Sequence, residues 1–212
     1  MMSTRLIDAP VVVRTTIFAT AAMAWLGSAS AAWAHPHHAS MVHGEHAFAQ
    51  GLLHPVMGLD HVLAMVAVGL WAGQIGGRRA WALPAAFVGL MLVGGFGAFA
   101  GIPLPAVEGG ILASVLVLGL LVAAALKLPV AAGTAVAGVA ALFHGYAHVS
   151  EMAADSSLAA YGAGFALGTA GLCAAGLGAS RLLQLRGQAV LVRACGGGIA
   201  TAGLVLAAVT WL

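Results

Sequence analysis

The chain has 212 residues, of which 62% are hydrophobic and only 7% are charged. Soluble domains carry about 25% charged residues, so this composition excludes a soluble globular protein and indicates an integral membrane protein. The formal net charge of +2 comes without a basic run or a stacking motif, so nucleic acid is not expected as a partner.

The amino-terminal segment, residues 1–34, has the three parts of a cleavable signal peptide. Arg5 and Arg14 supply positive charge, an apolar stretch covers 15–26, and Ala-Trp-Ala at 32–34 forms a small-x-small cleavage site. An uncleaved first helix is the alternative. Cleavage would leave the mature amino terminus on the external side of the membrane.

Residues 35–51 are predicted to form a histidine-rich external lead-in to the membrane domain. Closely spaced imidazoles bind late first-row transition metals, so this segment is interpreted as a metal-capture region. A polar lead-in without a specific role is the alternative. The candidate capture residues are His35, His37, His38, His43 and His46.

Residues 52–212 are predicted to be an all-α bundle of six transmembrane helices, the permease domain. The apolar stretches have the length of about 20 residues that a bilayer requires. Glycines four residues apart are expected to let these helices pack closely, as Gly69 and Gly73, Gly97 and Gly101, and Gly164 and Gly168. Cys173 and Cys195, both in apolar runs, are interpreted as packing residues. The predicted spans are 52–73, 81–101, 109–126, 130–150, 159–180 and 189–211.

The charged residues predict how the bundle is oriented, because basic residues gather on the cytoplasmic side. With the mature amino terminus outside, the basic residues fall inside and the loop carboxylates fall outside. We therefore predict a multi-pass protein of the bacterial inner membrane with a periplasmic amino terminus. The inner residues are Arg78, Arg79, Lys127, Arg181, Arg186 and Arg193, and the outer ones are Glu45, Glu108, Glu151 and Asp155.

The first span opens with the sequence HPVMGLDH, which contains His54, Asp60 and His61. A carboxylate at a transmembrane helix centre costs roughly 2.5 to 3.5 kcal/mol, so such groups indicate a functional site. Pro55 suits a first helical position, which would place His54 at the helix mouth. On one continuous helix His54 and His61 would share a face but lie about 10 Å apart along the axis. His54 is therefore interpreted as an outer, earlier contact.

The fourth span ends with FHGYAHVSE, in which His144 and His148 share a helix face and Glu151 points nearly the same way. We predict that Asp60 and His61 lie next to His144 and His148 and that the group binds one divalent ion. Asp60 is either a direct ligand or a group that orients an imidazole. The alternative is a set of polar groups that only bond helix to helix.

Three side chains near the motifs are not assigned to the metal site. Met57 and Met65 each lie four residues from His61 and are interpreted as packing residues. Tyr146 is either a hydrogen-bond partner in the site or an interfacial aromatic.

The two motifs together resemble the HupE/UreJ family of nickel/cobalt permeases. HPVMGLDH matches the family pattern HPxxGxDH, and FHGYAHVSE matches FHGxAHGxE except at Val149, where the family usually has Gly. The resemblance covers nearly the whole mature chain. It implies that the ion is handled by His54, Asp60, His61, His144, His148 and Glu151.

The predicted function is secondary transport: uptake of a divalent transition metal, nickel first and cobalt second. The ion is cargo, so neither a prosthetic group nor an enzymatic activity is expected. A system that matures a nickel enzyme is the expected downstream partner. The alternative is a membrane-embedded zinc hydrolase with Asp60 or Glu151 as base, although the sequence has no HExxH motif.

Overall fold

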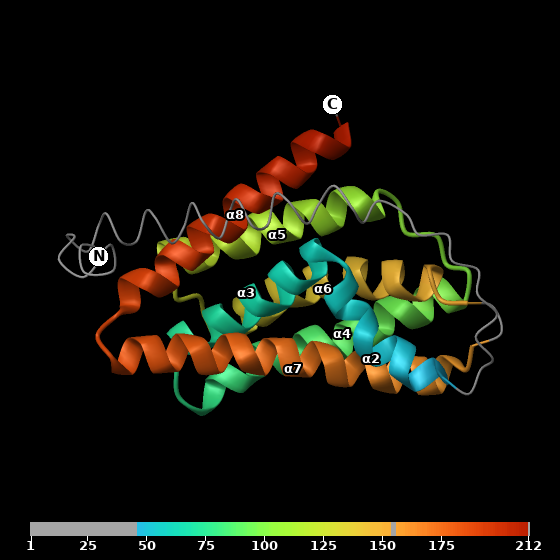
Figure 1. Cartoon of the computed structure of the whole chain (residues 1–212), viewed down its shortest axis with the longest axis horizontal. Helices are drawn as coiled ribbons and strands as arrows, with labels where there is room; N and C mark the ends of the chain where they lie inside the picture. Colours follow the sequence, from blue (N-terminus) through green and yellow to red (C-terminus); the bar gives the residue numbers. More distant parts are fainter. Residues whose placement is uncertain (1–45, 154–155, 212) are drawn as a thin grey trace, which may run out of the picture. The chain divides into compact units, whose positions relative to one another are not determined.

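The computed structural model describes residues 46–153 and 156–211, all within one compact unit, Val42–Leu212. Every regular element in these residues is a helix (Figure 1), which confirms the all-α fold class. The predicted signal peptide and the capture residues His35, His37, His38 and His43 lie outside the described residues.

The last five predicted spans correspond to helices of nearly the predicted bounds. The spans 130–150 and 189–211 agree with the structure at both ends, whereas the span predicted over 159–180 runs on to Leu185. Within the described residues, five helices are long and apolar enough to cross a membrane. The elements in chain order are α2 (Ala47–Met57), α3 (Leu59–Ile75), η3 (Arg78–Trp81), α4 (Ala82–Phe99), α5 (Val107–Ala124), α6 (Val130–Ser150), α7 (Leu158–Leu185) and α8 (Ala189–Trp211).

The prediction of one continuous helix over 52–73 is wrong. This segment forms α2 and α3, which meet at Gly58 with a bend of 83° and make a sixth span only when counted together. Pro55 lies inside α2 instead of at a first helical position, so it removes an amide donor shortly before the break. Gly58 is extended, with φ −105° and ψ 124°. In addition, α2 begins at Ala47, inside the predicted lead-in.

The bundle is assembled from closely packed helix pairs: α4 with α6, α5 with α8, and α7 with both α2 and α3. Each pair contains a glycine at which a Cβ atom would collide with the backbone of the partner helix. In lipid, such close approach replaces the hydrophobic drive that joins helices in water. These glycines include Gly145 on α6, Gly119 on α5, Gly69 on α3 and Gly164 on α7.

The structure agrees with two of the predicted glycine pairs and contradicts the third. Gly69 and Gly73 on α3 and Gly164 and Gly168 on α7 all pack against neighbouring helices, as predicted. For Gly97 and Gly101 the prediction is wrong, because no atom of a neighbouring helix lies within 4 Å of a Cβ built there. Gly101 lies in the turn after α4 with φ +70°, a conformation that glycine adopts without strain.

The two cysteines also differ. Cys173 is fully buried on α7, where it serves as a packing residue, as predicted. Cys195 is exposed on α8, so the packing interpretation is wrong there.

The two methionines near His61 differ as well. Met65 is fully buried, which confirms the predicted packing role, whereas Met57 is exposed at the end of α2.

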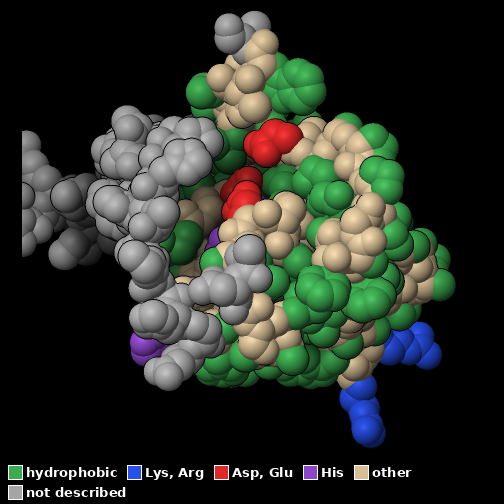
Figure 2. All heavy atoms as spheres, turned by 90° about the vertical axis from the view of Figure 1, so that its right-hand side faces the viewer, with side chains coloured by type: hydrophobic (Ala, Val, Ile, Leu, Met, Phe, Trp, Pro, Cys, Tyr) green, Lys and Arg blue, Asp and Glu red, His purple; other side chains and the backbone are tan. Residues whose placement is uncertain are grey.

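Basic and acidic side chains occupy opposite ends of the bundle. At one end, Arg181 donates a hydrogen bond to the Gly77 carbonyl (3.1 Å) and Arg193 donates to the Ala123 carbonyl (2.9 Å). A hollow of about 580 Å³ at this end is lined by Gly77, Arg78, Trp81 and Arg181. Figure 2 looks onto the other end, where α2 begins and α6 ends, and shows acidic side chains near the middle of that face.

Candidate metal centre

The structure brings the two histidine motifs together at the break between α2 and α3. His61 lies in the first turn of α3, and its ring centroid is 4.8 Å from that of His144 and 4.1 Å from that of His148. His144 and His148 are buried in the last two turns of α6. The three imidazoles form one cluster within the bundle.

Helix packing determines which way the imidazoles of α6 point. Gly145, between the two histidines of α6, lies against the backbone of Met91 on α4, so the closest face of α6 is turned toward α4. The imidazoles on the adjoining face lie beside α3. Phe87 of α4 lies 6.0 Å from His144, between ring centroids, and bounds the cluster on that side.

His54 reaches the same cluster by a different route from the predicted one. Because the helix bends by 83°, His54 and His61 do not share a face of one continuous helix, and that prediction is wrong. His54 instead packs its ring 4.6 Å from that of His148. Its Nε2 donates a hydrogen bond to Oε2 of Glu151 at 3.2 Å.

Exposure falls from Glu151 toward the centre of the cluster. The Glu151 side chain is 66% exposed, that of His54 26% and that of His61 11%. His144 and His148 are buried. These residues therefore form a series that leads from the end of the bundle to its interior. The hydrogen bond from His54 lowers the pKa of the Glu151 carboxyl, so this outermost group is more readily ionised.

Asp60 orients His61. Its Oδ1 accepts hydrogen bonds from the His61 backbone N–H at 2.9 Å and from His61 Nδ1–H at 2.7 Å. The carboxylate lies in the first turn of α3, where the helix dipole favours a negative charge. This geometry is that of a carboxylate that fixes the tautomer of a metal-binding imidazole. In the neutral imidazole this arrangement places the proton on Nδ1 and leaves Nε2 free to bind a ligand.

Several buried nitrogens of the cluster have no hydrogen-bond partner among the described residues: His61 Nε2, His144 Nδ1, and both ring nitrogens of His148. Leaving a buried polar atom unpaired costs about 1 to 3 kcal/mol. A concentration of such atoms in one place indicates a site whose partner is a ligand.

The imidazoles pack edge to face, and their nitrogens do not converge on one point. Within the described residues, no group of three or more His, Cys, Asp or Glu side chains is already arranged to hold one metal ion. Binding an ion at this cluster therefore requires the rings to rotate toward a common centre.

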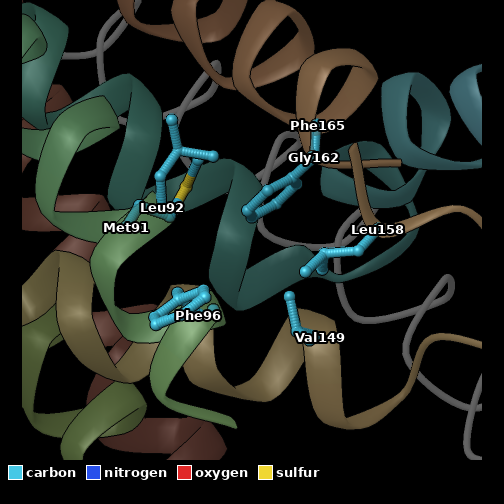
Figure 3. A pocket seen from close by; sticks show the side chains of 8 residues that line it. Met91, Leu92, Phe96, Val149, Leu158, Gly162 and Phe165 are labelled. Carbon is cyan, nitrogen blue, oxygen red and sulfur yellow. The ribbon is translucent and has the colours of Figure 1, made fainter. Parts of the chain in front are cut away.

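Apolar and aromatic side chains enclose the cluster on the side of α7. Phe165 packs against His148 at 4.0 Å between centroids, and Tyr161 donates a hydrogen bond from its hydroxyl to the His148 carbonyl at 3.2 Å. Phe165 also lines a pocket of about 150 Å³. Figure 3 shows Val149 pointing into this pocket. Its lining side chains carry no nitrogen or oxygen: Met91, Leu92, Gly95, Phe96, Val149, Leu158, Gly162 and Phe165.

Sequence reasoning missed two polar contributors. Ser114 of α5 lies 2.8 Å from His144 Nε2, and Tyr161 holds the backbone at His148. Ser114 could have been found as a lone hydroxyl within an apolar span. Tyr146 is half-buried and makes no hydrogen bond to the cluster in the described structure. His46 is exposed at the start of α2.

The fold and the cluster define a class: a multi-pass helical membrane protein with buried imidazoles that are reached from one end of the bundle. The chain belongs to the HupE/UreJ family, since the model of that family, described as HupE / UreJ protein, matches residues 22–206. It is 45% identical over 156 residues to Protein HupE of Rhizobium leguminosarum bv. viciae, covering 74% of this chain and 82% of that protein. No solved structure matches.

Family membership answers one question that the sequence left open. Members of this family are membrane transporters and not enzymes, so the prediction of a permease is confirmed and the zinc hydrolase alternative is wrong. The identity of the cargo and the residues that handle it belong to the proposal that follows.

Proposed function

We propose that this chain is a secondary transporter that takes up a divalent transition-metal ion, with nickel as the principal cargo and cobalt as the second. The observation that carries the proposal is the group of unpaired imidazole nitrogens at His61, His144 and His148. Neutral imidazole together with carboxylate suits divalent nickel, cobalt, zinc and iron better than it suits hard ions such as magnesium and calcium.

The series of exposures suggests the order of contacts. Glu151 and His54, at the open end, receive the hydrated ion. His61, His144 and His148 then replace its water, while Asp60 keeps His61 oriented. In many transporters the substrate site lies where a membrane helix is interrupted, as α2 and α3 are at Gly58. The ring nitrogens do not converge on one point, which is consistent with a site that releases its ion, as transport requires.

The membrane potential supplies the driving force in this proposal. With the basic end of the bundle in the cytoplasm and the mature amino terminus in the periplasm, the cluster is reached from outside. A divalent ion that moves inward gains roughly 4.6 kcal/mol per 100 mV, on the order of a thousandfold accumulation. The histidines of residues 35–46 would concentrate the ion, and a nickel-enzyme maturation system would consume it.

The test is uptake of radioactive nickel into right-side-out membrane vesicles with an imposed voltage. We expect His61→Ala, His144→Ala and His148→Ala to abolish uptake while the proteins remain in the membrane. Glu108→Gln, which neutralises an exposed carboxylate in the first turn of α5, is the control. Wild-type accumulation in all three cluster variants would refute the site. Competition by cobalt, zinc and iron would establish which ion is preferred.

A further inference from the structure

Ser114 connects α5 to the imidazole cluster. Its side chain is buried, and its Oγ lies 2.8 Å from Nε2 of His144 and 2.7 Å from the carbonyl oxygen of Ile111, one turn earlier on α5. The other ring nitrogen of His144, Nδ1, is buried and has no hydrogen-bond partner among the described residues. The hydroxyl is therefore the one side-chain hydrogen-bond partner that the described structure shows for this imidazole.

The positions of these atoms restrict where the protons lie. A carbonyl oxygen only accepts, and a serine hydroxyl has a single hydrogen to donate. When Ser114 donates to Ile111, its oxygen is left to accept from His144 Nε2–H. Both short contacts are then hydrogen bonds, and His144 Nδ1 carries a lone pair without a proton.

The opposite assignment is less favourable. If Ser114 donated to His144 Nε2, the ring proton would lie on Nδ1, where the described structure provides no acceptor. The short contact with Ile111 would also lose its hydrogen. That arrangement makes one hydrogen bond fewer and buries an unpaired donor, which is costly.

We propose that Ser114 is a positioning residue that fixes His144 in the tautomer with the proton on Nε2, so that Nδ1 is ready to bind metal. The inference deepens the proposed function and rests on it for its role in transport. It makes Ser114 the counterpart of Asp60, which holds the proton of His61 on Nδ1 and leaves Nε2 bare. Two adjacent imidazoles thus present unprotonated nitrogens.

The arrangement suits a site that must bind quickly. A metal ion needs a neutral imidazole with a free lone pair, and the hydrogen bond at the other nitrogen determines which one is free. Ser114 is uncharged, so it sets the tautomer without adding a negative charge beside the ion. This limits affinity compared with a second carboxylate and favours release.

The first measurement is the tautomer itself. The full chain, purified without metal and labelled with 15N in its histidine rings, gives separate NMR shifts for protonated and unprotonated ring nitrogens. The signals of His144 are assigned by their loss in His144→Gln. We expect protonated Nε2 and unprotonated Nδ1 in the wild type, and a mixture of tautomers in Ser114→Ala. A wild-type His144 with its proton on Nδ1 would overturn the inference.

The second measurement is nickel binding by equilibrium dialysis. Loss of a residue that orients a metal-binding imidazole typically costs about 10 to 100-fold in affinity, and we expect this range for Ser114→Ala. Ser114→Thr should bind within a few-fold of wild type, because a helical threonine hydroxyl makes the same bond to the preceding turn. Ser150→Ala is the control, since Ser150 donates to the Ala147 carbonyl in the same way but makes no hydrogen bond to an imidazole within the described residues.

These readouts separate the two proposals. Unchanged tautomer and unchanged affinity in Ser114→Ala would overturn the role of Ser114, even if transport of nickel is established. Absence of nickel binding to the wild type would instead refute the proposed function, and the NMR spectra would still decide whether Ser114 sets the tautomer. If Ser114→Ala and Ser114→Thr both lower the nickel affinity to the same extent, a role for the hydroxyl is contradicted.

Discussion

His61 and His148 lie edge to face with their ring centroids 4.1 Å apart, although two further membrane helices separate α3 from α6 along the chain. The contact exists because α3 begins at the break at Gly58, which places its first turn beside the last turns of α6. His54 reaches the other side of His148 from α2. Both halves of the broken helix therefore contribute to one cluster.

The hydrogen bonds of Asp60 predict a graded response to substitution. Asp60→Asn keeps an oxygen for His61 Nδ1–H but loses the charge, whereas Asp60→Ala loses both. We expect nickel affinity to fall about tenfold in the first variant and toward a hundredfold in the second. Equilibrium dialysis with the purified variants measures this. Equal affinity in both variants and wild type would show that Asp60 does not orient the site.

Glu151 and His54 are predicted to act as one unit at the open end of the cluster, because they share a hydrogen bond. Glu151→Gln or His54→Ala should raise the half-saturating nickel concentration for uptake by about tenfold, or roughly 1.4 kcal/mol. The double variant should be little worse than the worse single one, since a shared contact is lost only once. Additive losses would indicate independent roles, and Glu108→Gln, at an exposed carboxylate in the first turn of α5, serves as the control.

Close packing of α6 on α4 predicts sensitivity at Gly145. A methyl group there would collide with the Met91 carbonyl, so Gly145→Ala should destabilise the protein by about 1 to 3 kcal/mol. Gly97→Ala on α4 meets open space and should change stability by less than about 0.5 kcal/mol. Thermal unfolding of both variants in the same detergent makes the comparison. Equal melting temperatures would contradict the packing argument.

The histidines ahead of the bundle are predicted to affect capture and not the transport step. Deletion of residues 35–46 ends just before α2 begins at Ala47, so all the residues of the first described helix are kept. Uptake should fall at low nickel and recover at saturating nickel, because only the local concentration of the ion is changed. Initial rates over a range of nickel concentrations test this. An equal loss at saturation would contradict a capture role.

The candidate site was largely visible in the sequence, because polar groups within apolar spans are rare and costly. His61, His144 and His148 could be grouped by their shared depth in two spans, and the structure places them side by side. Ser114 could be noticed as a lone hydroxyl in an apolar span, but its contribution to the site could not be assigned. A single hydroxyl in an apolar helix has no pattern that specifies which imidazole it will meet.

The sequence by itself determined the class of structure and the positions of most helices, because the bilayer imposes a length and an apolar composition that are read locally. Only the tertiary structure decided the break at Gly58, the route of His54 to His148, and the partner of each imidazole nitrogen. Those features depend on which helices approach closely enough to touch. That approach is set by glycine contacts and hydrogen bonds between residues far apart in the chain.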